Sequence, residues 1–219
     1  MFRILLFAAL CSVVLAACGG DSGEPSGHKN PERAVVSWFE SIDDGDAPAA
    51  TASVHDGSLA LILAIENDLD TATTAAYLVD GIPIDVERSY WDSFADGFTE
   101  FASRPISSLT VGESEIFAAE GTTYARVPIS SGPASQSVVF TRQGEDGSWE
   151  VDVVATLADG FSSLLADLYN RLGAGDDADT IRAAYGDVVV PAMWAAMADG
   201  AFGDDFNRVA LTLVGEISS

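Results

Sequence analysis

The chain has 219 residues and is strongly acidic, with 34 Asp and Glu against 10 Lys and Arg and a formal net charge of −24. Such a surface excludes nucleic acid as a partner, because binding to DNA needs Lys and Arg to displace the counterions of the phosphates. It is also repelled by anionic lipid headgroups, whereas cationic ligands or divalent ions remain compatible with it. Since 48% of the residues are hydrophobic, we expect a folded domain with a sizeable core.

The N-terminus has the layout of a secretory signal. Arg3 is the only charged residue before an uncharged run from Ile4 to Ala17. A short cationic start followed by a short apolar stretch is typical of such signals, and a membrane-spanning helix needs roughly 20 apolar residues. The next segment, Gly19 to Asn30, is rich in Gly and Ser and predicts a flexible tether.

Leu15-Ala16-Ala17-Cys18, at the end of the uncharged run, resembles the lipobox of bacterial lipoproteins. The resemblance implies that Cys18 receives a diacylglycerol on its sulfur and that signal peptidase II cuts between Ala17 and Cys18. It also implies further acylation, for example with palmitate, of the new amino group. The expected product is an extracytoplasmic protein held on the cell membrane or outer membrane by lipid on Cys18. The alternative is an ordinary secretory signal, cut at an Ala-x-Ala-like site beside an incidental cysteine.

The two cysteines add little other chemistry. Cys11 lies in the segment that would be removed, and the sulfur of Cys18 would carry lipid. The mature chain is therefore expected to have no disulfide, thiolate metal site or cysteine nucleophile.

The first predicted elements are helices. Asn30 can cap a helix that has Pro31 in its first turn and ends at Asp43-Asp44-Gly45. A second helical region runs from Ala47 to Val79, broken near His55-Asp56-Gly57, after which Ser58 can act as a cap.

A further helix is expected to start at a capping Asp85 and to carry an aromatic stripe. A stripe of this kind forms either core or the wall of an apolar pocket. The candidate pocket-lining residues are Trp38, Trp91, Phe94 and Phe98.

The pattern changes to β-strands after Arg104-Pro105. The four strand-like segments, separated by Gly-containing turns, are 109–118, 122–129, 136–142 and 148–156. In the last of them Trp149 and Val151 alternate with Glu150 and Asp152. We therefore expect an antiparallel meander with one face packed on helices.

The last third of the chain is predicted to be helical. Apolar residues recur at helical spacing from Phe161 to Leu172, then from Ile181 to Ala196, and finally from Phe202 to Ile217. Pro191 is expected to kink or split the second of these helices.

Helices followed by antiparallel strands predict an α+β fold. The segment 31–39, the Asp44-Gly45-Asp46 stop and Asp146-Gly147-Ser148-Trp149-Glu150-Val151-Asp152 resemble the NTF2-like (cystatin-roll or SnoaL-like) superfamily. The resemblance implies N-terminal helices followed by a curved sheet that forms a cone. The C-terminal helices are additional to that cone. The expected organisation is a signal peptide (1–17), a lipidated cysteine with its tether (18–30), an NTF2-like domain (31–157) and a C-terminal helical extension packed on it (158–219).

The sequence contains no recognisable catalytic motif. His28 lies in the expected tether, and His55 is followed directly by Asp56, whose side chain is expected to point elsewhere. The acidic clusters at 43–46 and 176–179 lack the spacing of an EF-hand loop and are interpreted as solvated helix ends. No metal site, cofactor or catalytic residue is therefore predicted.

Three functions remain open. The first is a non-enzymatic, membrane-anchored binding or accessory domain for a small apolar ligand or an envelope protein. The second is a structural envelope protein with a filled core. The third is a small isomerase or dehydratase that uses a buried carboxylate as a base, which would require a buried Asp or Glu with a raised pKa facing a cavity.

Overall fold

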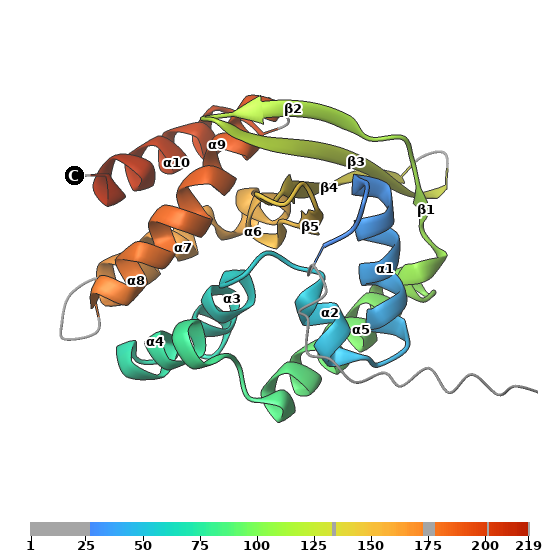
Figure 1. Cartoon of the computed structure of the whole chain (residues 1–219), viewed down its shortest axis with the longest axis horizontal. Helices are drawn as coiled ribbons and strands as arrows, with labels where there is room; N and C mark the ends of the chain where they lie inside the picture. Colours follow the sequence, from blue (N-terminus) through green and yellow to red (C-terminus); the bar gives the residue numbers. More distant parts are fainter. Residues whose placement is uncertain (1–26, 133–134, 173–177, 201, 219) are drawn as a thin grey trace, which may run out of the picture.

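The computed structural model describes residues 27–132, 135–172, 178–200 and 202–218. The fold is α+β, as predicted: N-terminal helices are followed by a curled antiparallel sheet in the form of a half-barrel and then by C-terminal helices (Figure 1). This arrangement is consistent with an NTF2-like cone. The predicted signal peptide, the Leu15–Cys18 lipobox and the tether up to residue 26 lie outside the described residues.

The N-terminal part consists of five helices and a short 3₁₀ turn. They are α1 (Pro31–Asp43), α2 (Ala47–Ala52), α3 (Ser58–Glu66), α4 (Thr71–Asp80), α5 (Ile84–Ala102) and η1 (Ile106–Ser108). The start of α1 is as predicted, since the side chain of Asn30 accepts a hydrogen bond from the backbone N–H of Arg33 at 2.8 Å.

Two other predicted caps are wrong. The residue before α3 is Gly57, which has a left-handed backbone (φ 76°), and Ser58 is already the first residue of the helix. Similarly, α5 begins after Pro83, so Asp85 lies in the first turn, where its charge still favours the N-terminal end of the helix dipole. Neither helix start has a side-chain cap, because Gly57 and Pro83 have no side-chain oxygen to accept the N–H groups.

The sheet has five antiparallel strands. They are β1 (Thr110–Val111), β2 (Glu115–Ala119), β3 (Thr122–Gly132), β4 (Ser135–Gln143) and β5 (Trp149–Val151). Their order is β1-β3-β4-β5, with β2 also paired to β3. Because β1 and β2 pair with successive parts of the same side of β3, they together form one edge of the curled sheet, and β5 lies at the other end of the order.

The remaining elements are helical. They are α6 (Val153–Thr156), α7 (Ala158–Leu172), α8 (Ala178–Ala184), the π-helical turn η2 (Tyr185–Val189), α9 (Val190–Asp199) and α10 (Asp204–Ile217). The irregularity predicted at Pro191 is η2, which directly precedes α9. Pro191 is the second residue of α9, which follows η2 without a break, so its missing N–H removes one helical hydrogen bond to the preceding turn.

Both faces of the sheet are covered, whereas the sequence predicted one. Ala125 and Val127 of β3 point toward α1, in a core that includes Trp38. The alternate residue Tyr124 points the other way and joins Phe140 in a core with the C-terminal helices. The predicted C-terminal extension therefore packs on the sheet face that α1 leaves free.

The described fold begins slightly before α1. The backbone N–H of His28 donates to the carbonyl of Trp149 at 2.9 Å, and the N–H of Trp149 donates to the carbonyl of His28 at 2.7 Å. This bridge attaches the entry of the chain to β5. Among the described residues, no helix is long and apolar enough to cross a membrane.

Truncating the core of the C-terminal helices should destabilise the whole fold. Leu168 of α7 is 2% exposed and belongs to the core cluster that also contains sheet and α3 residues. We expect Leu168→Ala to lower the free energy of unfolding by about 2–5 kcal/mol, measured by urea denaturation. The matched control is Leu164→Ala on the same helix, where the side chain is 44% exposed and the loss should be below about 1 kcal/mol. Equal losses in the two variants would contradict this packing of α7.

Candidate functional site

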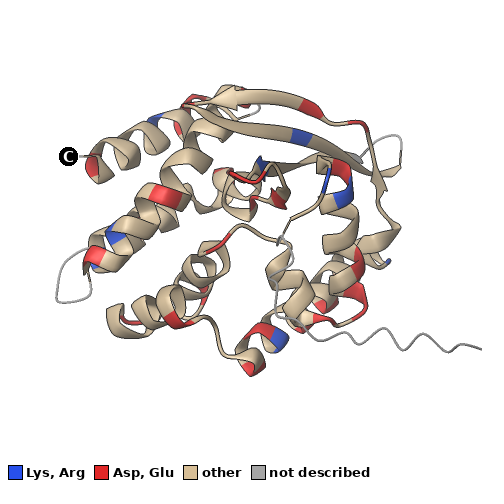
Figure 2. Ribbon diagram, viewed as in Figure 1, with Lys and Arg blue, Asp and Glu red and all other residues tan. Residues whose placement is uncertain are grey.

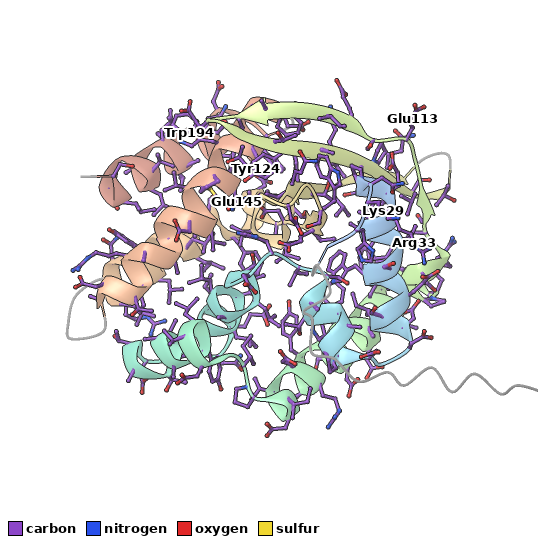
Figure 3. All side chains as sticks on the ribbon, viewed as in Figure 1. Lys29, Arg33, Glu113, Tyr124, Glu145 and Trp194 are labelled. Carbon is purple, nitrogen blue, oxygen red and sulfur yellow. The ribbon has the colours of Figure 1, made fainter. Side chains whose placement is uncertain are left out.

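A row of polar side chains crosses the sheet on the face covered by the C-terminal helices. In the register of the strands, Tyr124 of β3 is opposite Arg142 of β4, which is opposite Glu150 of β5. Asp152 follows Glu150 by two residues and so lies on the same face. Figure 3 shows Tyr124 between the strands and the C-terminal helices. Together with His55, these residues are called the His55 cluster below.

His55 reaches the row from the loop between α2 and α3. Its backbone N–H donates to the carbonyl of Val151 at 2.9 Å, which attaches the loop to β5. On its ring, Nδ1 lies 3.1 Å from Oε2 of Glu150, and Nε2 lies 2.8 Å from Nη1 of Arg142. Because a guanidinium can only donate, Nε2 must accept, and the ring proton lies on Nδ1 and is donated to Glu150. Both ring nitrogens are therefore committed within the cluster.

Arg142 extends this chain of hydrogen bonds to the C-terminal helices. Its Nη1 also donates to the backbone carbonyl of Asp187 at 2.8 Å. Asp187 lies in η2, where a π-helical turn changes the direction of the backbone carbonyls. The guanidinium thus connects the sheet, the α2–α3 loop and η2.

Asp152 is the most deeply buried charged residue of the cluster. Its Oδ1 accepts from the backbone N–H of Ala155 at 2.8 Å and caps α6. Its Oδ2 and the hydroxyl of Tyr124 are both buried with no hydrogen bond of good geometry to any described residue, and the Tyr124 hydroxyl acts on the Asp152 carboxyl by lowering its pKa. Burial raises the pKa of Asp152, although the Ala155 N–H, His55 and Arg142 act in the opposite direction. Burial likewise raises the pKa of the Tyr124 hydroxyl, which stays protonated.

A hollow of about 470 Å³ opens beside the cluster. His55, Arg142 and Glu150 contribute to its walls, together with residues of the β2–β3 and β4–β5 turns. Asp152 is not among its lining residues. The three cluster residues at this hollow are therefore already paired through His55, and the buried carboxylate of Asp152 does not reach it.

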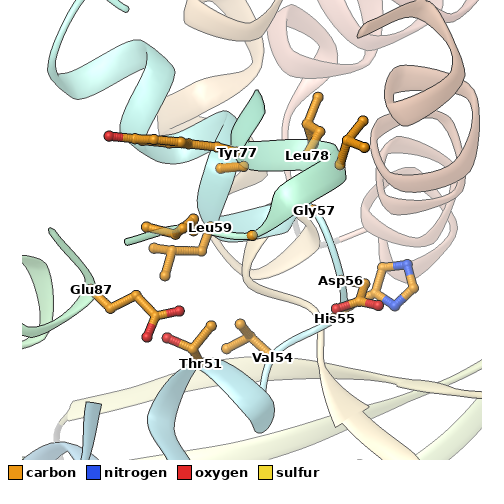
Figure 4. Close-up of a pocket in the computed structure, with 13 residues that line it drawn as sticks. Thr51, Val54, His55, Asp56, Gly57, Leu59, Tyr77, Leu78 and Glu87 are labelled. Carbon is orange, nitrogen blue, oxygen red and sulfur yellow. The ribbon is translucent and has the colours of Figure 1, made fainter. Parts of the chain in front are cut away.

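A second hollow, of about 290 Å³, lies on the other side of His55 and is called the Glu87 hollow below (Figure 4). It is enclosed by the end of α2, the α2–α3 loop, the start of α3, the end of α4 and the start of α5. Its lining residues are Thr51, Val54, His55, Asp56, Gly57, Leu59, Ala60, Tyr77, Leu78, Val79, Gly81, Ile82 and Glu87.

Glu87 is held in place by a short relay of hydrogen bonds. Nε1 of Trp91 donates to Oγ1 of Thr51 at 2.9 Å, and the hydroxyl of Thr51 in turn hydrogen-bonds the Glu87 carboxylate. Partial burial raises the pKa of Glu87, and the bond from Thr51 opposes that shift. The carboxylate therefore lies partly buried at the wall of the hollow.

The predicted pocket residues are divided between core and surface. Trp38, Trp91 and Phe94 pack on one another, with ring centroids 5.8–6.2 Å apart. Phe98 instead lines a separate apolar hollow of about 280 Å³, beside the exposed Phe101. That these four residues line a ligand pocket stays a prediction, as does lipidation of Cys18.

The sequence interpretation missed the His55 cluster and Glu87. The contact between His55 and Glu150 joins residues 95 positions apart, which no local pattern reveals. The one available signal was the pair Glu150 and Asp152 on the same face of a strand. The sequence predicted that the C-terminal helices pack on the domain, but it did not show that they cover this face of the sheet.

Among the described residues, no group of three or more His, Cys, Asp or Glu side chains is arranged to hold a metal ion. The chain matches no protein-family model, no curated protein and no solved structure. The interpretation of the site therefore depends on its geometry alone.

The buried carboxyl group should make stability depend on pH. Because the native state keeps the Asp152 proton to a higher pH than the unfolded chain, where the ordinary value is 3.8, ionisation lowers the stability of the wild type as the pH rises above about 4. Asp152→Asn keeps an oxygen for Ala155 but cannot ionise. Between pH 4 and 8 the variant should gain stability relative to wild type, by ~1.4 kcal/mol per unit of raised pKa. The measurement is urea denaturation across this range.

The matched control is Asp70→Asn at the exposed cap of α4. The hydrogen bonds from Thr73 lower the pKa of Asp70, so its titration lies below pH 4 and has the opposite sign. This control should show no relative gain between pH 4 and 8. Parallel stability curves for wild type and Asp152→Asn would show that Asp152 is not perturbed by burial.

Proposed function

We propose that this protein is a lipid-anchored, extracytoplasmic binding domain of the NTF2-like superfamily. It would be held on the cell membrane or outer membrane by lipid on Cys18 and would act without catalysis, as an accessory domain for a small ligand or an envelope protein. The observation that carries the proposal is the position of Leu15-Ala16-Ala17-Cys18, directly between an uncharged run and a polar segment. The order of helices and curved sheet supports the assignment to the superfamily.

The charge of the domain agrees with attachment through lipid alone. Asp and Glu residues occur on helices and strands throughout the ribbon in Figure 2, where Lys and Arg are few. Such a surface gains nothing from anionic headgroups, so the attachment must come from the acyl chains. Each buried CH₂ contributes about 0.8 kcal/mol, and two or three chains anchor far more firmly than one.

The geometry of the site favours binding over catalysis. A general base needs a free lone pair within reach of the substrate, whereas both ring nitrogens of His55 are committed to Arg142 and Glu150. Asp152 has the burial and the raised pKa expected of a carboxylate base, but it does not line the neighbouring hollow. A structural protein with a filled core would need no hollow, and the Glu87 hollow therefore supports a binding domain over that alternative.

The lipid anchor is tested by Cys18→Ser in the native host. A serine has no thiol to receive the diacylglycerol, and signal peptidase II acts on the lipidated precursor. The variant should therefore keep residues 1–17 and incorporate no fatty acid. Growth with an alkynyl palmitate, followed by intact-protein mass spectrometry, measures both properties. Cys11→Ser is the control and should be processed and labelled normally, since Cys11 lies in the removed segment. Normal processing and labelling of Cys18→Ser would refute the anchor.

A further inference from the structure

We propose that the Glu87 hollow binds a small organic cation, namely an ammonium group joined to an apolar body of up to about ten non-hydrogen atoms. The inference builds on the proposed function, because it names the ligand class of the binding domain. Three features of the hollow carry it: its size and walls, its charge, and the way in which its carboxylate is held.

The size and walls fit a small ligand with an apolar body. A volume of about 290 Å³ is at the lower end for ligand pockets. Val54, Leu59 and Ile82 line it with aliphatic groups, and Tyr77 contributes an aromatic ring. In Figure 4 the ring of Tyr77 and the side chain of Leu59 lie on the side of the hollow opposite Glu87 and Thr51. A ligand between them would meet an apolar wall on one side and oxygen atoms on the other.

The charges around the hollow select a cation. Its lining includes the carboxylates of Glu87 and Asp56 and contains no Lys or Arg. His55 is the only basic residue of the lining, and its ring already binds Glu150 and Arg142. An anionic ligand would thus face two carboxylates without a free cation. An ammonium group would donate a charged hydrogen bond to the Glu87 carboxylate and can also contact the face of an aromatic ring such as Tyr77.

Glu87 is both positioned for a ligand and without a counter-charge. The relay from Trp91 through Thr51 fixes the carboxylate before any ligand arrives, which lowers the entropy lost on binding. Among the described residues, no Lys or Arg forms an ion pair with Glu87, whereas Asp199, whose side chain is 1% exposed, is paired with Arg126. A partly buried carboxylate without a counter-ion, at the wall of a hollow, is a favourable place for a cationic ligand.

The test is isothermal titration calorimetry on the mature, lipidated chain in zwitterionic phospholipid nanodiscs, with empty nanodiscs as the blank. The probes are phenethylammonium, the neutral 2-phenylethanol and the anionic 3-phenylpropionate, which are similar in size and differ in charge. We expect phenethylammonium to bind at least tenfold more tightly than the alcohol, and the carboxylate not to bind. This comparison uses the wild-type protein and so does not depend on the folding of a variant.

The role of Glu87 is tested by Glu87→Gln, which keeps the shape and an acceptor for Thr51 but removes the charge. It should weaken phenethylammonium binding about tenfold and leave 2-phenylethanol unchanged. Asp204→Asn on α10, outside the hollow, changes the net charge equally and should have no effect.

The outcomes separate this inference from the proposed function. Equal binding of amine and alcohol, or unchanged amine affinity in Glu87→Gln, would refute the cation site and still leave a binding domain for neutral apolar ligands. No binding of any probe would refute the inference and remove the hollow as support for a binding domain. The membrane anchor is decided independently by Cys18→Ser.

Discussion

The chain of hydrogen bonds from Asp187 through Arg142 and His55 to Glu150 is the interaction on which the arrangement of the molecule depends. It joins the sheet, the loop that precedes α3 and the π-helical turn that precedes α9. The side chains of His55, Arg142 and Glu150 are only partly exposed, so a missing partner among them would leave a charge or a polar group poorly hydrated. In the structure each of these groups has a partner. The Arg142 guanidinium donates to the Asp187 carbonyl and to Nε2 of His55, and Nδ1 of His55 donates its proton to the Glu150 carboxylate. These hydrogen bonds specify how the sheet, the α2–α3 loop and η2, which are far apart in the sequence, are placed relative to one another.

Asp152 lies at the connection between the last strand of the sheet, β5, and the helix α6. It comes directly after β5, and its carboxylate caps α6, which leads into the C-terminal helices. A fully buried carboxyl group is costly when it is charged, and the structure offsets this in part through the Ala155 N–H and the Tyr124 hydroxyl. The raised pKa of Asp152 is therefore the consequence of its place at a buried strand-to-helix connection, and it needs no catalytic explanation.

The parts of the fold that follow from local chemistry could be predicted from the sequence. The cap and proline before α1, the apolar repeat of α7 and the glycine-containing turns between strands all act within a few residues. The caps of α3 and α5 were misassigned by one or two residues, because Gly57 and Pro83 end the preceding loops themselves. The general order of helices and strands was therefore correct, although these two boundaries were not. The predicted strand 148–156 was also wrong in its second half: β5 ends at Val151, and Asp152 caps the helix α6 instead.

The candidate site could not be predicted in the same way, because it is made by pairing over long distances. Glu150 and Asp152 looked like the solvent face of a hairpin, and only the packing of the C-terminal helices on that face turns them into buried groups. His55 looked like a loop residue, which it is, but the loop is attached to β5 through Val151. The aromatic stripe is divided in a similar way: Trp91 is buried against Trp38 of α1, whereas Phe98 and Phe101 line a hollow at the surface.

The His55 cluster and the Glu87 hollow are connected through one loop, and this connection explains how a small hollow can keep its shape. The α2–α3 loop forms one wall of the hollow, and it is fixed on its other side to β5 through the backbone and the ring of His55. Another wall comes from α5, which carries Glu87 and Trp91. Trp91 donates a hydrogen bond to Thr51 of α2, and Thr51 hydrogen-bonds Glu87. Gly57 belongs to the first wall and has a left-handed backbone (φ 76°). A Cβ at this position would lie 3.3 Å from the side chains of Leu78 and Val188. The loop is therefore packed closely between α4 and η2, and the two walls are held by separate parts of the fold. Because each wall is fixed before a ligand arrives, binding need not order either of them.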